Sequence, residues 1–201
     1  MVYIYQPHRI LLERIVNDLK GYIEGDILNA GCGSYDRYEF DGNVIKMDII
    51  KKEGVVYGDI HDIPFEDKKF DNIVCTEVLE HVKDPQLALK EIYRVLKDGG
   101  KVLLTVPQGV EVHEAPHHYW KFTEYGIKML AENVGFRIIK QQSFGNWYSS
   151  VHHIIIRKLI KKFDLYNRPI VGRIVSRLSR LMMRFKNNDD HILGWCFVLK
   201  K

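Results

Sequence analysis

The sequence predicts an α/β fold built on a mostly parallel β-sheet, and three observations lead to that prediction. An apolar run over residues 27–30 breaks into Gly31-Cys32-Gly33, as a strand does when it ends in a tight turn. A nearly continuous apolar run over residues 70–76 is typical of a parallel strand that is covered on both faces. Stripes of apolar residues at helical spacing separate such runs, as expected of βαβ units.

Length and composition favour one folded domain spanning residues 1–201, with 46% hydrophobic and 28% charged residues. No apolar run approaches the ~20 residues needed to span a bilayer, and the first residues lack the pattern of a secretory signal peptide. We therefore expect a cytoplasmic protein. Cys32, Cys75 and Cys196 show no paired spacing, so we expect reduced, mostly buried cysteines.

Helices and strands are expected in alternation along the chain. The predicted helices cover residues 7–21, 85–98 and 124–134, and we expect the first of them to serve packing only. In chain order, the predicted strands cover residues 27–30, 44–48, 55–57, 70–76, 101–106, 136–144 and 194–199. Asp84 and Pro85 are a typical N-cap and first turn of a helix whose buried stripe includes Leu87, and Gly99-Gly100 is expected to close it. Thr123 is the expected N-cap of the third helix.

The second predicted strand ends in Asp48, seventeen residues after Gly31. Nucleotide-binding βαβ units place an acid at this distance, where it accepts hydrogen bonds from ribose hydroxyls. A dinucleotide fingerprint would have a third glycine where this chain has Asp36, and that carboxylate would repel a pyrophosphate. It would not repel S-adenosylmethionine, which carries a sulfonium and no phosphate, so we favour this cofactor over NAD(P).

The stretch from His117 to Thr123 adds a longer motif, His-x-Tyr-Trp-x-Phe-Thr. With the glycine turn and Asp48, the chain resembles the class I S-adenosylmethionine-dependent methyltransferases, in particular the small type 11-like proteins that carry this motif. The resemblance covers residues 25–140 and the last strand. It implies a Rossmann-like, seven-stranded, mostly parallel sheet, in which the last strand inserts antiparallel between the fifth and sixth strands.

The same resemblance implies where the cofactor is held. Asp48 would bind the ribose, Asp59 and Ile60 the adenine, and Glu77, ahead of Glu80, would balance a positive charge of the methionine end. The expected cofactor-binding residues are Asn29, Gly31, Cys32, Gly33, Asp48, Ile49, Asp59, Ile60, Thr76 and Glu77.

The methyl acceptor is expected near the motif of residues 117–123, which follows a parallel strand and so lies at the same sheet edge as the glycine turn. Tyr119 and Trp120 are the expected substrate-shaping residues. A hydroxyl acceptor would need a base, for which His81, His117 and His118 are candidates; His81 could equally well just end a helical turn. No cysteine accompanies these histidines and their spacing fits no common zinc pattern, so we expect no metal.

Residues 147–187 are predicted to form a basic helical insert before the last strand. Ten Lys and Arg residues and one acid, Asp164, lie between residues 151 and 186. Ile174, Leu178, Leu181 and Phe185 form an apolar stripe beside a row of arginines. The insert could pack on the body, bind an anionic membrane surface or bind RNA. Aromatic residues that could stack on RNA bases are scarce, so we rank lipid binding above RNA binding. It would overhang the active site as a lid.

We therefore expect methyl transfer from S-adenosylmethionine to a small-molecule, glycan or lipid-linked acceptor. A catalytically silent cofactor-binding module that acts through the basic helices is the first alternative. An NAD(P)-dependent oxidoreductase is a weaker one, because of Asp36.

Overall fold

A computed structural model describes residues 7–33, 38–163, 169–182 and 191–201 and contains a seven-stranded sheet in the order β3-β2-β1-β4-β5-β7-β6. The strands are β1 (Glu24–Ala30), β2 (Asp41–Asp48), β3 (Val56–Tyr57), β4 (Phe70–Thr76), β5 (Leu96–Pro107), β6 (Arg137–Phe144) and β7 (Gly194–Lys200). The helices are α1 (Pro7–Leu19), α2 (Pro85–Val95), α3 (Glu124–Val134), α4 (Trp147–Phe163) and α5 (Pro169–Met182), with 3-10 turns η1 (Lys20–Tyr22) and η2 (Leu79–His81).

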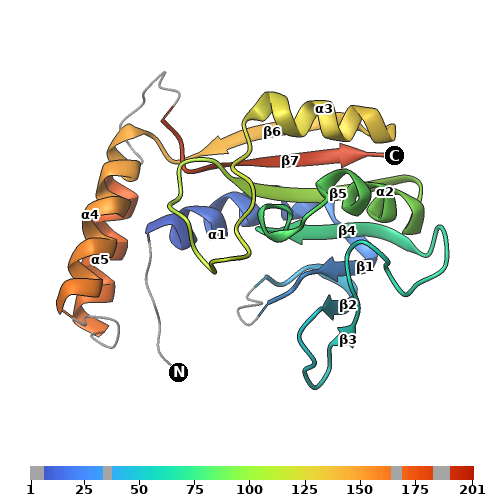
Figure 1. Ribbon diagram of the computed structural model, residues 1–201, viewed down its shortest axis with the longest axis horizontal. Helices are drawn as coiled ribbons and strands as arrows, with labels where there is room; N and C mark the ends of the chain where they lie inside the picture. Colours follow the sequence, from blue (N-terminus) through green and yellow to red (C-terminus); the bar gives the residue numbers. More distant parts are fainter. Residues whose placement is uncertain (1–6, 34–37, 164–168, 183–190) are drawn as a thin grey trace.

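The direction of the strands confirms the predicted topology. Strands β1 to β5 pair in parallel, whereas β7 pairs antiparallel with both β5 and β6. The last strand therefore inserts between the fifth and sixth strands, as expected. The parallel strands end on the side of the molecule where α4 and α5 lie (Figure 1).

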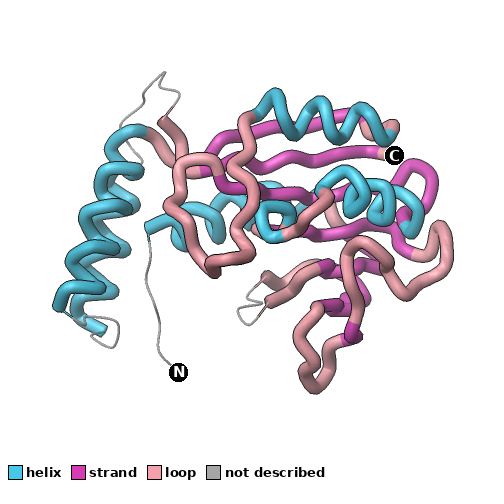
Figure 2. The backbone as a smooth tube through the Cα atoms, viewed as in Figure 1, coloured by secondary structure: helices cyan, strands magenta, loops and turns pink. Residues whose placement is uncertain are grey.

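Helices cover both faces of the sheet (Figures 1 and 2). Neighbouring strand residues point to opposite faces, so Leu28 and Ile73 pack in a core with α2 and α3, whereas Ile27 and Val74 pack with α1 on the other side. All four side chains are fully buried. This double cover explains the nearly continuous apolar run of β4.

The predicted helix caps are confirmed, but one helix end was misplaced. The Asp84 carboxylate accepts a hydrogen bond from the Leu87 N–H at 2.9 Å, and the Thr123 hydroxyl accepts one from the Gly126 N–H at 3.1 Å. Helix α2 ends at Val95 instead of running to Gly99-Gly100, because Leu96 already pairs with Phe70 in the sheet. The Leu87 side chain, which we expected to be buried, is 41% exposed.

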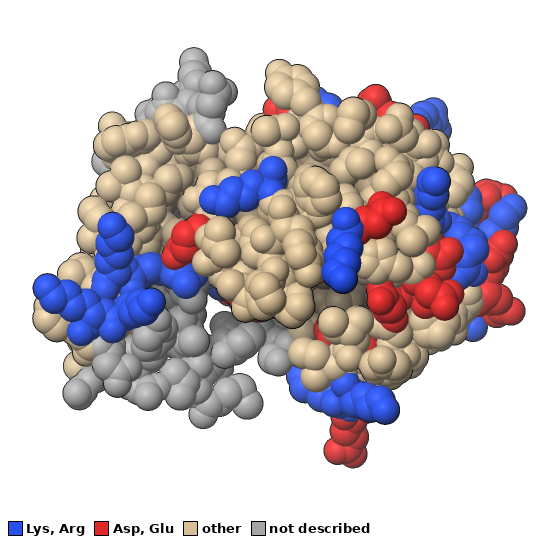
Figure 3. All heavy atoms as spheres, viewed as in Figure 1, with Lys and Arg blue, Asp and Glu red and all other residues tan. Residues whose placement is uncertain are grey.

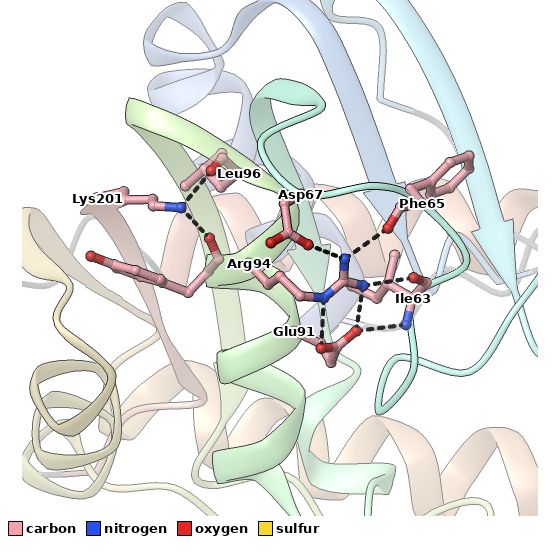
Figure 4. A network of polar contacts seen from close by, with 8 residues as sticks. Ile63, Phe65, Asp67, Glu91, Arg94, Leu96 and Lys201 are labelled. Carbon is pink, nitrogen blue, oxygen red and sulfur yellow. Dashed lines mark hydrogen bonds and ion pairs between the residues drawn. The ribbon is translucent and has the colours of Figure 1, made fainter.

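An arginine on α2 holds the loop between β3 and β4 (Figure 4). The Arg94 guanidinium donates to the carbonyl oxygens of Ile63 at 2.9 Å and Phe65 at 2.8 Å and pairs with the Glu91 carboxylate at 2.7 Å. Glu91 in turn accepts from the Ile63 N–H at 3.0 Å. The network holds residues 63–67 of the loop that also contains Asp59, one of the residues expected to contact the cofactor.

Helices α4 and α5 form the predicted insert between β6 and β7 and lie side by side (Figure 1). Both contact α1, and Ile160 and Val175 are buried in the contact region. The predicted apolar stripe of α5 faces outward, since Ile174, Leu178 and Leu181 are 53%, 36% and 46% exposed. Residues 183–187, including Phe185, lie outside the described residues. None of the described helices is long and apolar enough to cross a membrane.

Candidate active site

The glycine turn and Asp48 lie in contact at the carboxyl ends of β1 and β2. The Gly31 N–H donates to the Met47 carbonyl at 2.8 Å, and the Gly33 N–H donates to Asp48 Oδ2 at 2.7 Å. Gly31 and Gly33 adopt φ values of +75° and +60°, a conformation that favours glycine. The Asp48 carboxylate therefore holds the glycine turn, which lies about fifteen residues earlier in the chain. The turn and Asp48, predicted separately, form one site.

The Asp48 carboxylate keeps the capacity to bind a sugar diol. Its second oxygen, Oδ1, accepts from the Ile50 N–H at 2.9 Å, so each oxygen carries one backbone donor. A carboxylate oxygen has two lone pairs, which leaves one on each oxygen for a ribose hydroxyl. Ile49, next to it, is 66% exposed and offers an apolar side chain beside this position.

The end of β4 closes the other side of the glycine turn. A methyl group added at Gly31 would lie 2.5 Å from Cγ2 of Val78, so only glycine allows the two segments to pack this closely. Glu77 has a φ of +56°, and its N–H donates to the Thr105 carbonyl at 3.1 Å. Thr76 and Glu77 therefore lie beside the predicted cofactor turn.

The residues expected at the adenine differ in exposure. Asp59 Oδ1 accepts from the His61 N–H at 2.9 Å and lies 2.7 Å from His61 Nδ1. Partial burial opposes ionisation, but these hydrogen bonds from His61 lower the pKa of Asp59. Ile60 is only 5% exposed and lies in the core, so Ile49 has more apolar surface available than Ile60 has.

Glu77 is held by a residue that the sequence analysis assigned to packing. His8, at the start of α1, places Nε2 3.1 Å from Glu77 Oε2, and the Thr105 hydroxyl donates to Glu77 Oε1 at 3.3 Å. The Glu77 side chain is 5% exposed. Burial alone would raise the pKa of Glu77, but the neighbouring His8 ring and Arg9 guanidinium hold it below its usual value. No local pattern could have paired positions so far apart in sequence.

The predicted acceptor motif folds onto η2. The Tyr119 N–H donates to the Glu80 carbonyl at 2.7 Å, and the Trp120 indole N–H donates to the Val82 carbonyl at 2.8 Å. His81 Nδ1 lies 2.8 Å from the His117 carbonyl oxygen. Tyr119 and Trp120 are 40% and 41% exposed. Tyr119 is therefore anchored by its backbone and Trp120 by its indole ring, while part of each residue remains open to a ligand.

Three histidines gather around the buried carboxylate of Glu80. The His113 and His118 rings are 4.5 Å apart between centroids, and the His81 ring lies 4.9 Å from His113. His117 stays outside this group: its ring is exposed and lies 3.1 Å from the Tyr119 hydroxyl. The sequence analysis named His81, His117 and His118 as catalytic candidates, and the structure brings His81 and His118 together with His113, which it did not name.

Glu80 is completely buried, and no other described residue donates a hydrogen bond to either of its carboxylate oxygens. Burial, with the nearby Glu77 carboxylate, raises the pKa of Glu80 well above its usual value. The sequence analysis ranked Glu80 below Glu77. The loop that carries Tyr119 packs on Glu80 from far along the chain, so no local pattern shows that Glu80 is buried.

Helix α4 is attached to the loop after β5. His153 Nε2 lies 2.9 Å from Glu111 Oε2, and Arg157 pairs with the other oxygen of the same carboxylate. His153 is fully buried, and its ring lies 6.0 Å from that of His8. Burial lowers the pKa of His153 to about 4 despite the Glu111 carboxylate. The insert is thereby tied to the segment that carries His113.

This buried histidine predicts a stability that falls on acidification. The pKa of His153 in the folded protein is about 4, below the 6.5 of an ordinary histidine, so in mild acid the unfolded chain binds a proton that the folded chain does not. Between about pH 7 and pH 5 we expect the free energy of unfolding to drop by ~2 kcal/mol from this group. Urea unfolding of the wild type and of His153→Gln measures it; equal pH slopes in the two proteins would contradict it.

A hollow of about 700 Å³ lies at the opposite edge of the sheet, at residues 24–25, 71–72 and 97–101. Two of its charged side chains pair with each other, since Lys97 Nζ lies 2.7 Å from Asp71 Oδ1. The other Asp71 oxygen accepts from the Asp26 N–H at 2.9 Å. Ligands of open α/β sheets bind at the carboxyl ends of the strands, so we assign the active site to the glycine-turn edge.

Comparisons with known proteins agree with this geometry. Residues 28–104 match a family model described as a methyltransferase domain. The uncharacterized protein MJ0638 of Methanocaldococcus jannaschii is 35% identical over 94% of this chain and 84% of its own length. A demethylmenaquinone methyltransferase of Staphylococcus haemolyticus is 24% identical over 74% of this chain and 83% of its own.

A solved structure shares the fold. The phosphoethanolamine N-methyltransferase 2 of Haemonchus contortus, in complex with S-adenosyl-L-methionine, superposes with a TM-score of 0.57 at 20% identity, over 96% of this chain and 51% of its own. A bare-backbone turn held by an acid with spare lone pairs suits the adenosine part of that cofactor. Taken together, the matched family model, the relatives and the sheet order make this chain a member of the class I S-adenosylmethionine-dependent methyltransferases.

Proposed function

We propose that the protein methylates a small-molecule, glycan or lipid-linked acceptor that binds between the glycine turn and the loop of residues 113–123. The observation that carries the proposal is the contact between Asp48 and Gly33, with the β4 end packed against the same turn. S-adenosylmethionine supplies a methyl group activated by a sulfonium. The protein's task is to hold the acceptor in line with it and to exclude water.

Each part of the site has a proposed task. Asp48 binds the ribose, Asp59 and Ile49 contact the adenine, with Ile60 packed beneath, and Glu77 balances the positive charge of the methionine end. The glycine turn of Gly31, Cys32 and Gly33, with Asn29 and Thr76 at the strand ends, leaves room for the rest of the cofactor. Tyr119 and Trp120 orient the acceptor, and His81, His117 and His118 are candidates to take a proton from a hydroxyl acceptor.

Transfer of a labelled methyl group tests this proposal. The purified protein is incubated with methyl-labelled S-adenosylmethionine and, in separate reactions, with a lipid extract, a pool of sugars and small metabolites, and tRNA. We expect label in the lipid or small-molecule fraction. Label in tRNA alone would refute the acceptor class, and no label in any fraction would favour the catalytically silent alternative.

We further propose that the α4–α5 surface meets an anionic membrane, where a lipid-linked acceptor would be found. Outward-facing apolar residues lie beside basic ones on both helices, and Lys and Arg gather on this side of the molecule (Figure 3). The exposed apolar residues are Ile154, Ile155, Leu159, Phe163, Ile170, Ile174, Leu178 and Leu181. A helix that merely packed on the body would bury this stripe instead. Each base near an anionic surface contributes ~1 kcal/mol.

The membrane surface predicts binding to anionic vesicles. We expect the protein to sediment with phosphatidylserine-containing vesicles at low salt, and the double variant Ile174→Asp, Leu178→Asp to stay in the supernatant, because the apolar face no longer inserts. Met129→Asp is the matched control, since Met129 is a 57% exposed residue of another helix. Equal sedimentation of the double variant would refute the proposal, and so would retention on tRNA without vesicle binding.

A further inference from the structure

The carboxylate of Glu80 lacks the hydrogen bonds that a buried charge normally requires. It is 0% exposed, and no other residue in the described part of the chain donates to Oε1 or Oε2. An uncompensated carboxylate in the interior costs several kcal/mol, so such a group is normally neutral, paired or bound to a metal. The nearest cationic candidates are the rings of His81 and His113, whose Nε2 atoms lie 3.5 Å and 4.0 Å from Glu80 Oε1.

Both rings present a lone pair to Glu80. His81 Nδ1 lies 2.8 Å from the His117 carbonyl oxygen, and His113 Nδ1 lies 3.1 Å from the Glu111 carbonyl oxygen. A carbonyl only accepts, so each Nδ1 carries the proton and each Nε2 is unprotonated in the neutral ring. Two lone pairs thus face the Glu80 carboxyl group, whose oxygens accept no hydrogen bond from any other described residue. Metal-binding histidines are oriented in this way, with the second nitrogen donating to a carbonyl.

We propose that Glu80, His81 and His113 bind a divalent transition-metal ion of the zinc type. One ligand atom from each residue lies within 4.8 Å of the other two. Metal–ligand bonds of ~2.0–2.2 Å in a tetrahedron place ligand atoms ~3.4 Å apart, so a small side-chain adjustment closes the site. Two imidazoles and one carboxylate suit zinc, iron or cobalt better than magnesium or calcium, which prefer oxygen ligands.

Three protein ligands leave a fourth position for an exogenous oxygen. The site lies two residues beyond Val78, which packs against Gly31 of the cofactor turn. The next step, and only this step, rests on the proposed methyl transfer. In that reaction the ion would bind the acceptor through a hydroxyl oxygen. A bound ion lowers the pKa of that hydroxyl, and its proton passes to bulk water. In this arrangement His81 is a ligand and not a base, and the preferred acceptor is a hydroxyl compound.

Cobalt binding tests the site independently of catalysis. Untagged protein is treated with a chelator, dialysed and titrated with Co²⁺ alone, and the visible absorption of a tetrahedral complex is recorded with circular dichroism as a check of folding. We expect one Co²⁺ per chain, and Glu80→Gln and His113→Gln to weaken binding at least 100-fold. His191→Gln is the matched control, because His191 is exposed and lies outside the cluster.

Two results would overturn the proposal. One is the absence of Co²⁺ binding by the folded wild type, in which case Glu80 is a neutral acid beside His81. The other is wild-type affinity in both Glu80→Gln and His113→Gln. Binding of S-adenosylhomocysteine, measured by calorimetry on the same samples, separates failure of the metal site from failure of the proposed function.

Discussion

Replacing Asp48 by alanine is expected to weaken S-adenosylhomocysteine binding by about 100-fold, or ~3 kcal/mol. The variant loses two hydrogen bonds from a carboxylate to the ribose, each of ~1.5–3 kcal/mol. It also leaves the Gly33 N–H, which now donates to Asp48 Oδ2 at 2.7 Å, without this acceptor. Isothermal titration calorimetry of the purified proteins with S-adenosylhomocysteine gives the ratio of the affinities.

Two further variants help to interpret the affinity of Asp48→Ala. Asp48→Asn keeps one acceptor oxygen at the same place, so its affinity should fall between those of the wild type and Asp48→Ala. Asp98→Ala removes a 69% exposed carboxylate at the start of β5, where it pairs with Lys68, and this variant should bind the ligand like the wild type. Unchanged affinity in Asp48→Ala, with folding intact, would disprove the assignment of the ribose site.

The cofactor side of the site could be predicted from sequence because it follows from strand order. The glycine turn and Asp48 end two neighbouring parallel strands, and the carboxyl ends of parallel strands lie at one edge of the sheet. Local patterns were enough to locate both features. The position of β7 between β5 and β6 came from the family resemblance alone, and the structure confirms it. The predicted end of α2 was wrong because Leu96 pairs with Phe70 in the sheet, so the helix ends before it reaches Gly99-Gly100.

The acceptor side could not be predicted to the same depth. His8, Glu80 and His113 come from α1, η2 and the loop after β5, and their meeting depends on how those segments pack. Periodicity also says that α5 has an apolar face, but not whether that face is covered. The exposed Ile174 is an example, since its spacing alone fits a buried position as well as a surface one.

Gly31→Ala is expected to lower the free energy of unfolding by about 3 kcal/mol, which is a large share of a typical domain's ~5–15 kcal/mol. Gly31 has a φ of +75°, and an L-residue in this left-handed region costs ~1–2 kcal/mol. The added methyl group would also lie 2.5 Å from Val78 Cγ2, an overlap that forces the β4 end to shift and costs ~1–3 kcal/mol. Urea unfolding followed by circular dichroism measures the sum.

The two costs can be separated. Gly54→Ala is the control for the backbone cost, because Gly54 has a φ of +72° and no described atom within 4 Å of an added methyl group. It should lose only ~1–2 kcal/mol. Val78→Ala removes the overlapping methyl groups, so in the double variant with Gly31→Ala the overlap cost should disappear, giving a coupling energy of ~1–3 kcal/mol. Additive losses would mean that the glycine turn and the segment after β4 do not pack against each other. The proposed cofactor site would then no longer be bounded by Val78.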